Sequence, residues 1–292
     1  MPNHYDVAVV GRGIVGLAHA LAAARTGARV VVIDREPAAR GASIRNFGFV
    51  TVSGQARGEM WSLARRSRDV WAEAAPEAGI AIDQRGLLQL AQRREGVAIL
   101  EAFLATEMGE GCELLTPDAA RARFGLDGFG DLSAVMTSPH ELRVEPRLAL
   151  PALAEWLSAH WGVEFQRAAG IECAPGVVCT AVGDFRAARI FICPGDDVTG
   201  LFPEVMARRG VIRCKLQMLR MAPTGRVLPA PVMSDLSLIR YEGFAALDAA
   251  QPLRERLRAE HGALLDAGVH LIAVQSADGW LVVGDSHEYD AA

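Results

Sequence analysis

The sequence predicts an α/β protein in which a mainly antiparallel α+β domain is inserted into a domain built on a parallel sheet. A strand, a glycine-rich turn, a helix and a second strand follow one another at the N-terminus. An apolar strand of the same type returns at residues 188–193, and the segments between and after alternate short strands with isolated helices. We expect residues 1–54 and 146–212 to form the first domain, and residues 55–145 and 213–292 to form the second.

The N-terminal unit has the pattern of a dinucleotide site. Residues 5–10 are a short apolar run that leads into the glycine pattern of residues 11–16, then into a helix, and then into a strand that ends on Asp34. In a Rossmann-like unit the first glycine allows the tight turn, the second lets backbone N–H groups approach a pyrophosphate, and the third lets the helix pack on the strand. The helix N-terminus favours negative charge, and the acid is placed to bind a ribose. The cofactor-binding candidates in this unit are Gly11, Gly13, Ile14, Val15, Gly16, Asp34 and Arg35.

A loop of small and polar residues, 41–48, follows the acidic strand end. Glycine together with Ser43, Arg45 and Asn46 indicates a loop that runs beneath a second part of the ligand and offers donors to a polar ring edge. The alternative is an ordinary solvent-exposed loop, in which case the unit would suit a nicotinamide dinucleotide.

The other elements follow from apolar spacing and helix caps. Helices are expected at residues 58–75, 94–108, from 117, 146–161 and 252–266. Strands are expected at residues 80–82, 86–90, 135–142, 188–193, 214–221, 227–233, 236–241, 269–275 and 280–283. Pro76 is expected to end the first of these helices, and Thr116 with Pro117 to begin the third. Gly195 follows the strand 188–193 at its carboxyl end, where open α/β sheets bind ligands.

Composition excludes several classes of function. The formal net charge of −5 gives no electrostatic footprint for nucleic acid. No run of 18 apolar residues could span a bilayer, and the N-terminal run lacks a basic leader, so we expect a cytoplasmic protein. The five cysteines form no CxxC pair, and the seven histidines show no metal-ligand spacing, so neither a disulfide framework nor a metal site is expected.

Four motifs together resemble a known family. They are the three glycines with Asp34, the loop 41–48, the re-entry Leu142–Arg147 and the strand end Ile192–Gly195. This combination resembles the D-amino acid oxidase (DAO) family of FAD-dependent oxidoreductases over nearly the whole chain. A finer similarity links Arg240, Tyr241 and the ending Gly284–Tyr289 to a subgroup proposed to act on aminophosphonates.

The resemblance implies a role for each candidate residue. FAD would lie extended across the first domain, with its flavin at the interface with the substrate domain. The three glycines would serve the pyrophosphate and Asp34 the ribose. The flavin side would be served by Ser43, Arg45, Asn46 and Gly48, and adenine by the backbone near Ala169. The loop 41–48 contains neither His nor Cys, so we expect non-covalent FAD. The substrate-side candidates are Arg240, Tyr241, His287 and Tyr289.

The activity implied is hydride removal from the carbon next to the nitrogen of a small anionic amine. The product would be an imine that hydrolyses to a carbonyl compound and ammonia. The electron acceptor would be O₂ or another compound, and an oligomer is compatible with the sequence. Two alternatives stay open, an NAD(P)-dependent dehydrogenase and a flavin-binding subunit without turnover of its own.

The resemblance also implies a longer C-terminus. Family members continue past the last substrate-domain strand into a segment that returns to the FAD domain. This closing segment is not seen after Tyr289. We therefore expect the 292-residue chain to hold FAD mainly by its ADP half and to turn over poorly.

Overall fold

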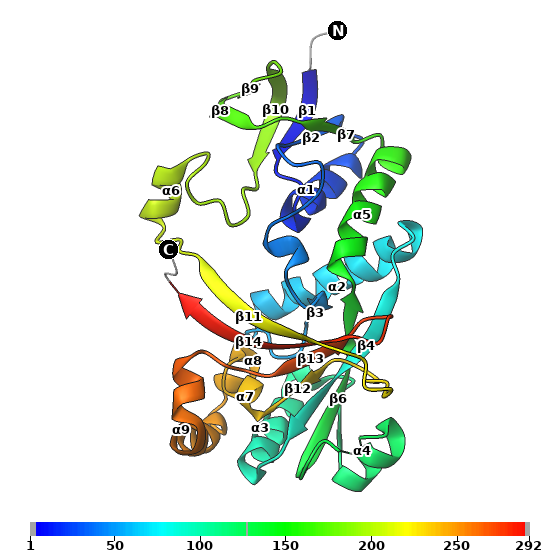
Figure 1. Cartoon of the computed structure of the whole chain (residues 1–292), viewed down its shortest axis with the longest axis vertical. Helices are drawn as coiled ribbons and strands as arrows, with labels where there is room; N and C mark the ends of the chain where they lie inside the picture. Colours follow the sequence, from blue (N-terminus) through cyan, green and yellow to red (C-terminus); the bar gives the residue numbers. More distant parts are fainter. Residues whose placement is uncertain (1–3, 127, 290–292) are drawn as a thin grey trace.

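The computed structural model of the chain describes residues 4–126 and 128–289. Residues 290–292, at the end of the second predicted domain, lie outside this range. Two sheets organise the molecule, one in the upper half of Figure 1 and one across its lower half. The first has six strands in the order β7-β2-β1-β10-β9-β8. The second has eight, with β5 pairing beside β6 in addition to the order β11-β14-β13-β12-β4-β6-β3. The predicted α/β class is confirmed.

The elements associated with the first sheet come from the beginning and the middle of the chain. Its strands are β1 (His4–Val10), β2 (Val30–Asp34), β7 (Glu164–Arg167), β8 (Gly170–Ala174), β9 (Val177–Thr180) and β10 (Phe185–Ile192). The helices near it are α1 (Ile14–Ala24), the 3₁₀ turn η1 (Ala42–Ile44), α5 (Pro146–Trp161) and α6 (Pro203–Arg208).

The second sheet draws on two later stretches. Its strands are β3 (Phe49–Val50), β4 (Ile82–Ala91), β5 (Glu113–Leu115), β6 (Ala134–Val144), β11 (Cys214–Met221), β12 (Val232–Met233), β13 (Ile272–Gln275) and β14 (Leu281–Tyr289). The accompanying helices are α2 (Glu59–Glu77), α3 (Arg94–Leu104), η2 (Glu107–Gly109), α4 (Pro117–Phe124), α7 (Asp235–Leu238), α8 (Glu242–Ala245) and α9 (Ala250–Asp266). β3 falls within the predicted range 1–54 of the first domain yet pairs with β6 of the second sheet. The domain boundaries themselves stay a prediction.

Parallel pairing in the first sheet brings three strand ends to one edge. β1 lies between β2 and β10, with Val10 opposite Ile33 on one side and Ile192 on the other. β-Branched residues fill these strands because they are buried on both faces. α1 and α5 cover one face, where Leu17 and Leu157 join the core. The turns after β1, β2 and β10 therefore meet at a single edge.

The second sheet is mainly antiparallel and is covered on one face by helices. Phe103 of α3, Phe244 of α8 and Leu253 of α9 form its main apolar cluster. β14 lies between β11 and β13 and pairs antiparallel with both.

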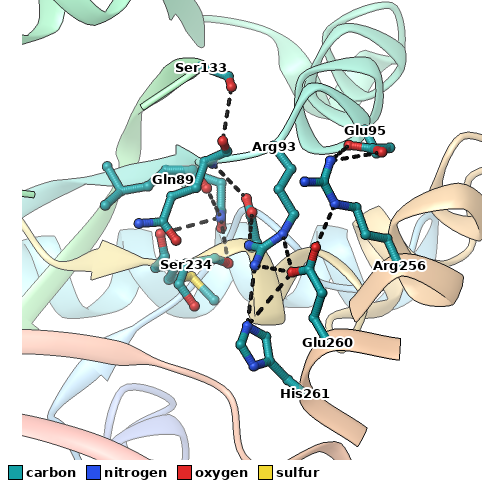
Figure 2. Close-up of polar contacts among 12 residues, drawn as sticks. Gln89, Arg93, Glu95, Ser133, Ser234, Arg256, Glu260 and His261 are labelled. Atoms are coloured by element: carbon teal, nitrogen blue, oxygen red, sulfur yellow. Dashed lines mark hydrogen bonds and ion pairs between the residues drawn. The ribbon is translucent and has the colours of Figure 1, made fainter. Parts of the chain in front are cut away.

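A polar network joins the helices of this layer to β4. Figure 2 shows Arg93 between α9 and α7, donating to Glu260 and to the buried Asp235 at 2.5 and 2.8 Å. Arg256 extends the network by bonding both Glu260 and Glu95. Burial raises the pKa of the Asp235 carboxyl, and the bond from Arg93 opposes that shift. The network therefore keeps a buried carboxylate paired while linking three helices.

Several predicted elements differ from the structure. Residues 236–241, expected as a strand, form α7 and a turn, because the Asp235 carboxylate accepts the Gln92 N–H and the Arg93 guanidinium and draws the segment against α3. Of the strand 227–233 only β12 forms, since the Leu228 N–H bonds the Gln275 side chain instead of a neighbouring strand.

Three boundaries also differ. The expected pair of strands at residues 80–82 and 86–90 is one strand, β4, with two register shifts. α2 continues to Glu77 with Pro76 inside its last turn, where a missing N–H costs only one hydrogen bond. α3 ends at Leu104 because Thr106 caps the separate turn η2.

Candidate functional site

The first cavity lies at the edge where β1, β2 and β10 end. Its volume is about 360 Å³. Eight of the predicted cofactor-binding residues line it: Gly11, Gly13, Asp34, Arg35, Ser43, Arg45, Ala169 and Gly195. The loop after β10, which includes Asp196 and Asp197, closes the far side. The five other predicted residues, Ile14, Val15, Gly16, Asn46 and Gly48, are not part of the lining.

Each of the three glycines in the turn disfavours a side chain for a different physical reason. Gly11 has φ +111°, and a Cβ there would lie 2.1 Å from the Cys193 carbonyl oxygen. A Cβ on Gly16 would lie 1.8 Å from the Gly11 carbonyl oxygen. Gly13 instead has an ordinary φ of −71°, and its Cβ would meet only the Ser43 hydroxyl at 2.9 Å. Chain packing therefore requires the first and third glycines, whereas the second keeps space open in the cavity.

Asp34 is oriented by the backbone on either side of it. Its carboxylate accepts the Arg12 N–H at 2.7 Å and the Glu36 N–H at 2.8 Å. Each oxygen can accept a further hydrogen bond, since a carboxylate accepts about four, and Asp34 lines the cavity. Arg35, the next residue, pairs with Asp197 of the loop after β10 at 3.2 Å. Asp34 thus suits a ribose hydroxyl, and Arg35 ties the two walls together.

The loop 41–48 is held by its own side chains. The Ser43 hydroxyl accepts the Ile14 N–H at 3.0 Å, which fixes the loop to the first turn of α1. The Asn46 amide donates to the Ala42 and Ser43 carbonyls at 2.9 and 3.0 Å, and its oxygen accepts the Gly48 N–H. All these Asn46 contacts lie within the loop, so in this structure Asn46 shapes the loop. Gly48, with φ +67°, packs against the Val144 carbonyl.

The second cavity lies beneath this loop and has a volume of about 390 Å³. Phe47, at the end of the loop, lines it together with Met60 of α2. Three of the four substrate-side candidates also line it: Arg240, Tyr241 and His287. The fourth, Tyr289, accepts a hydrogen bond from the Arg240 guanidinium at 3.1 Å. The loop 41–48 therefore joins the two cavities, with Ser43 and Arg45 in the first and Phe47 in the second.

Burial controls the protonation of the aromatic and imidazole groups here. Burial raises the pKa of Tyr241 to about 12, with a smaller contribution from the Asp285 carboxylate. The Tyr241 hydroxyl is therefore a neutral donor at physiological pH. Burial lowers the pKa of His270, and the Asp285 charge opposes that shift.

Two buried polar residues of the lining were missed by the sequence prediction, His270 and Asp285. Both are almost fully buried, at 4% and 5% exposure. Asp285 had a usable signal, because Asp285, His287 and Tyr289 alternate along one strand and so share a face. His270 had none, since it lies before β13 and reaches the site only through strand pairing.

The glycine turn at residues 11–16, Asp34 and the loop 41–48 fit an extended dinucleotide in the first cavity. A model of the DAO family, described as FAD dependent oxidoreductase, matches residues 6–292. The chain belongs to the DAO family. It is an FAD-dependent oxidoreductase, and the NAD(P)-dependent alternative is therefore wrong.

Solved structures agree with the DAO family assignment at the level of fold. The chain is similar to glycine oxidase from Bacillus cereus ATCC 14579, with 17% identity, 98% of this chain and 72% of that chain covered, and a TM-score of 0.70. It is similar to L-proline dehydrogenase from P. horikoshii, at 19% identity, 97% and 70% coverage and a TM-score of 0.71. It is also similar to L-α-glycerophosphate oxidase from Mycoplasma pneumoniae, solved with FAD bound. The identity is 14%, 99% of this chain and 73% of that chain are covered, and the TM-score is 0.70. No curated protein matches the chain.

Other expectations from the sequence do not follow from the DAO family assignment. Within the residues that the structure describes, none of the helices is long and apolar enough to cross a membrane. The aminophosphonate subgroup and the role of each residue belong to the proposal below.

Proposed function

We propose that this DAO-family chain oxidises the C–N bond of a small anionic amine, an amino acid or an aminophosphonate. The product would be an imine that hydrolyses to a carbonyl compound and ammonia. The observation that carries the proposal is the second cavity. Arg240 and Tyr241 line it together with Phe47, at the end of the loop 41–48 that also lines the first cavity. That arrangement supports Arg240 as an anion partner beside the expected position of the reacting ring.

The first cavity would hold the ADP half of non-covalent FAD. Gly13, Asp34 and Ala169 line this cavity, where Gly13 would leave room for the pyrophosphate, Asp34 would accept from the ribose and the Ala169 backbone would contact the adenine. Ser43 and Arg45 also line the cavity and would serve the flavin side of the cofactor. The finer assignments of Ile14, Val15, Gly16, Asn46, Gly48 and Gly195 stay predictions.

The substrate would be bound and oriented by the residues of the second cavity. Bound FAD supplies the hydride acceptor. The Arg240 guanidinium, held by the Tyr289 hydroxyl, offers a fixed donor to a carboxylate or phosphonate. The neutral Tyr241 hydroxyl would add a second donor, and His287 would contribute an imidazole to the lining. Positioning of the reacting C–H bond is the protein's main contribution to such a reaction.

The proposal is tested by spectroscopy on the purified full chain. Absorbance establishes whether flavin copurifies, and anaerobic addition of amino acids and aminophosphonates shows which of them bleach it. Glycerol phosphate, which carries an anion but no amine, is the matched negative. Bleaching by an anionic amine alone supports the proposal.

Two results would contradict it. Bleaching by glycerol phosphate and by none of the amines would make the substrate an alcohol. A flavin-loaded protein that no compound bleaches would favour the remaining alternative, a flavin-binding subunit without turnover of its own. Comparison of carboxylate and phosphonate amines decides between the two proposed substrate classes.

A further inference from the structure

Three potential metal ligands converge on the second cavity. His270, Asp285 and His287 each direct one nitrogen or oxygen into a space where all three atoms lie within 4.8 Å of one another. His270 lies just before β13 and the other two lie on β14, and all three line the cavity. We propose that they bind a divalent first-row transition-metal ion such as Zn²⁺.

The closest pair has the spacing of metal ligands. The His270 Nε2 and Asp285 Oδ1 atoms are 3.3 Å apart. With bonds of about 2.0 to 2.2 Å, neighbouring ligands of a tetrahedral zinc ion lie about 3.3 to 3.6 Å apart. Asp285 Oδ1 nevertheless forms no hydrogen bond within residues 4–126 and 128–289. A buried carboxylate oxygen that accepts no hydrogen bond calls for an ion or a water at this point.

His287 is already oriented as a metal ligand. Its Nδ1 lies 2.9 Å from the Gly268 carbonyl oxygen. A carbonyl only accepts hydrogen bonds, so Nδ1 carries the proton and the Nε2 lone pair is free. Metal-binding histidines commonly donate their second nitrogen in this way to a backbone carbonyl. Nε2 faces the other Asp285 oxygen at 4.0 Å, and the two imidazole rings stack 5.0 Å apart.

Charge also favours a cation among these residues. Asp285 is 5% exposed, and the groups in direct contact with its carboxylate are the two imidazoles. Arg240, the nearby guanidinium, is exposed and bonds Tyr289. A buried carboxylate without a compensating positive charge is costly, whereas a bound divalent ion offsets its charge. Two imidazoles and one carboxylate suit zinc, iron or nickel better than calcium or magnesium.

The fourth position of such an ion would face the second cavity. Three protein ligands with one open position are the arrangement in which zinc binds water or an anionic ligand. The proposal departs from the expectation of no metal site, because the sequence separations of these residues match no local motif. It does not depend on the proposed amine substrate, since its test measures metal content.

The test uses the full chain with its FAD. The protein is stripped with EDTA, equilibrated with Zn²⁺, passed through gel filtration and analysed for zinc. We expect about one zinc per chain in the wild type, and less than a tenth of that in Asp285→Asn and His287→Ala. His160→Ala, which removes an imidazole stacked on Trp156 far from the cavity, should retain wild-type zinc. Every protein carries Cys214→Ser, because the exposed Cys214 thiol lies across the strands from Tyr289 and could bind zinc itself.

Thermal unfolding separates loss of the ligand from loss of the fold. Zn²⁺ should raise the Tm of the wild type and of His160→Ala, because a ligand that binds only the native state stabilises it. It should leave the Tm of Asp285→Asn unchanged. A wild type that retains no zinc would overturn the proposal. Equal zinc retention in all variants would also overturn it, by showing adventitious binding.

Discussion

Arg143 on β6 is paired with Asp83 on β4, although both side chains are almost completely buried. The same guanidinium donates to Glu145, to the Ser276 hydroxyl and to the Phe47 carbonyl. One cation therefore joins the second sheet, the start of α5 and the loop 41–48. Burial raises the pKa of the Asp83 carboxyl while Arg143 opposes that shift, so the ionised form of Asp83 depends on Arg143.

Arg143→Met should destabilise the protein strongly, because it leaves two carboxylates without their cation. We expect the free energy of unfolding to fall by about 3 to 5 kcal/mol, as for other broken buried pairs. Denaturant unfolding measures this change. Lys215→Met is the matched control, since its pair with Glu288 at 3.2 Å is exposed and should contribute little. Equal effects of the two variants would show that the Arg143 cluster does not stabilise the fold.

Gly13→Ala should lower FAD affinity without unfolding the chain. The added Cβ meets only the Ser43 side chain and no backbone atom, but it fills the space that the pyrophosphate needs. We expect at least a tenfold loss of affinity, about 1.4 kcal/mol, in a flavin titration. Gly262→Ala in α9 is the control, because its Cβ makes only an ordinary contact with Arg258. Unchanged flavin content in Gly13→Ala would contradict the cofactor assignment.

Arg240→Met should weaken binding of the substrate more than binding of the cofactor. Loss of one charged hydrogen bond to the substrate anion is expected to cost about 1.5 to 3 kcal/mol, or roughly tenfold to a hundredfold in kcat/KM. The reduction rate of bound flavin against amine concentration measures the effect. Arg208→Met on α6 is exposed and remote from the second cavity, so it should behave as wild type. A KM for Arg240→Met equal to that of the wild type would exclude Arg240 as the anion partner.

The Glu260 interactions should make part of the stability sensitive to acid. Hydrogen bonds from Arg256 and Arg93 lower the pKa of Glu260 from 4.5 to about 2 (Figure 2). A lowered folded-state pKa means stability that is present above the unfolded value and lost as the pH falls through the folded value. Glu260→Gln should therefore have a lower Tm than wild type at neutral pH, and the difference should shrink between pH 4.5 and about 2.

The control for this pH dependence is Glu113→Gln, whose carboxylate has one exposed partner, Arg123. Its Tm difference from wild type should be small throughout. A Glu260→Gln difference that stays constant across the acid range would show that the ionised carboxylate is not the stabilising form.

The sequence by itself determined the dinucleotide edge of the fold, because its signals are local. The turn from Gly11, the helix after it and Asp34 lie within one βαβ unit, where spacing alone dictates which groups meet. Residues 146–161 and 214–221 were likewise predicted with the observed bounds, since caps and alternation operate over a few residues. Asn46 was predicted as a loop donor, and only the folded loop shows that its amide bonds its own backbone.

Tertiary structure alone decided the second cavity and the segment before it. Residues 236–241 alternate as a strand would, yet burial of Asp235 against Arg93 turns the chain into α7, because pairing a buried carboxylate outweighs local preference. His270 and Asp285 meet only because β13 and β14 pair, and Arg240 reaches them from the turn after α7. Arg240, Tyr241 and His287 were predicted as substrate-side residues and line this cavity, whereas no local spacing relates His270 to Asp285. Strand register and burial bring those two together, and this is the physical reason that their pairing could not be predicted from the sequence.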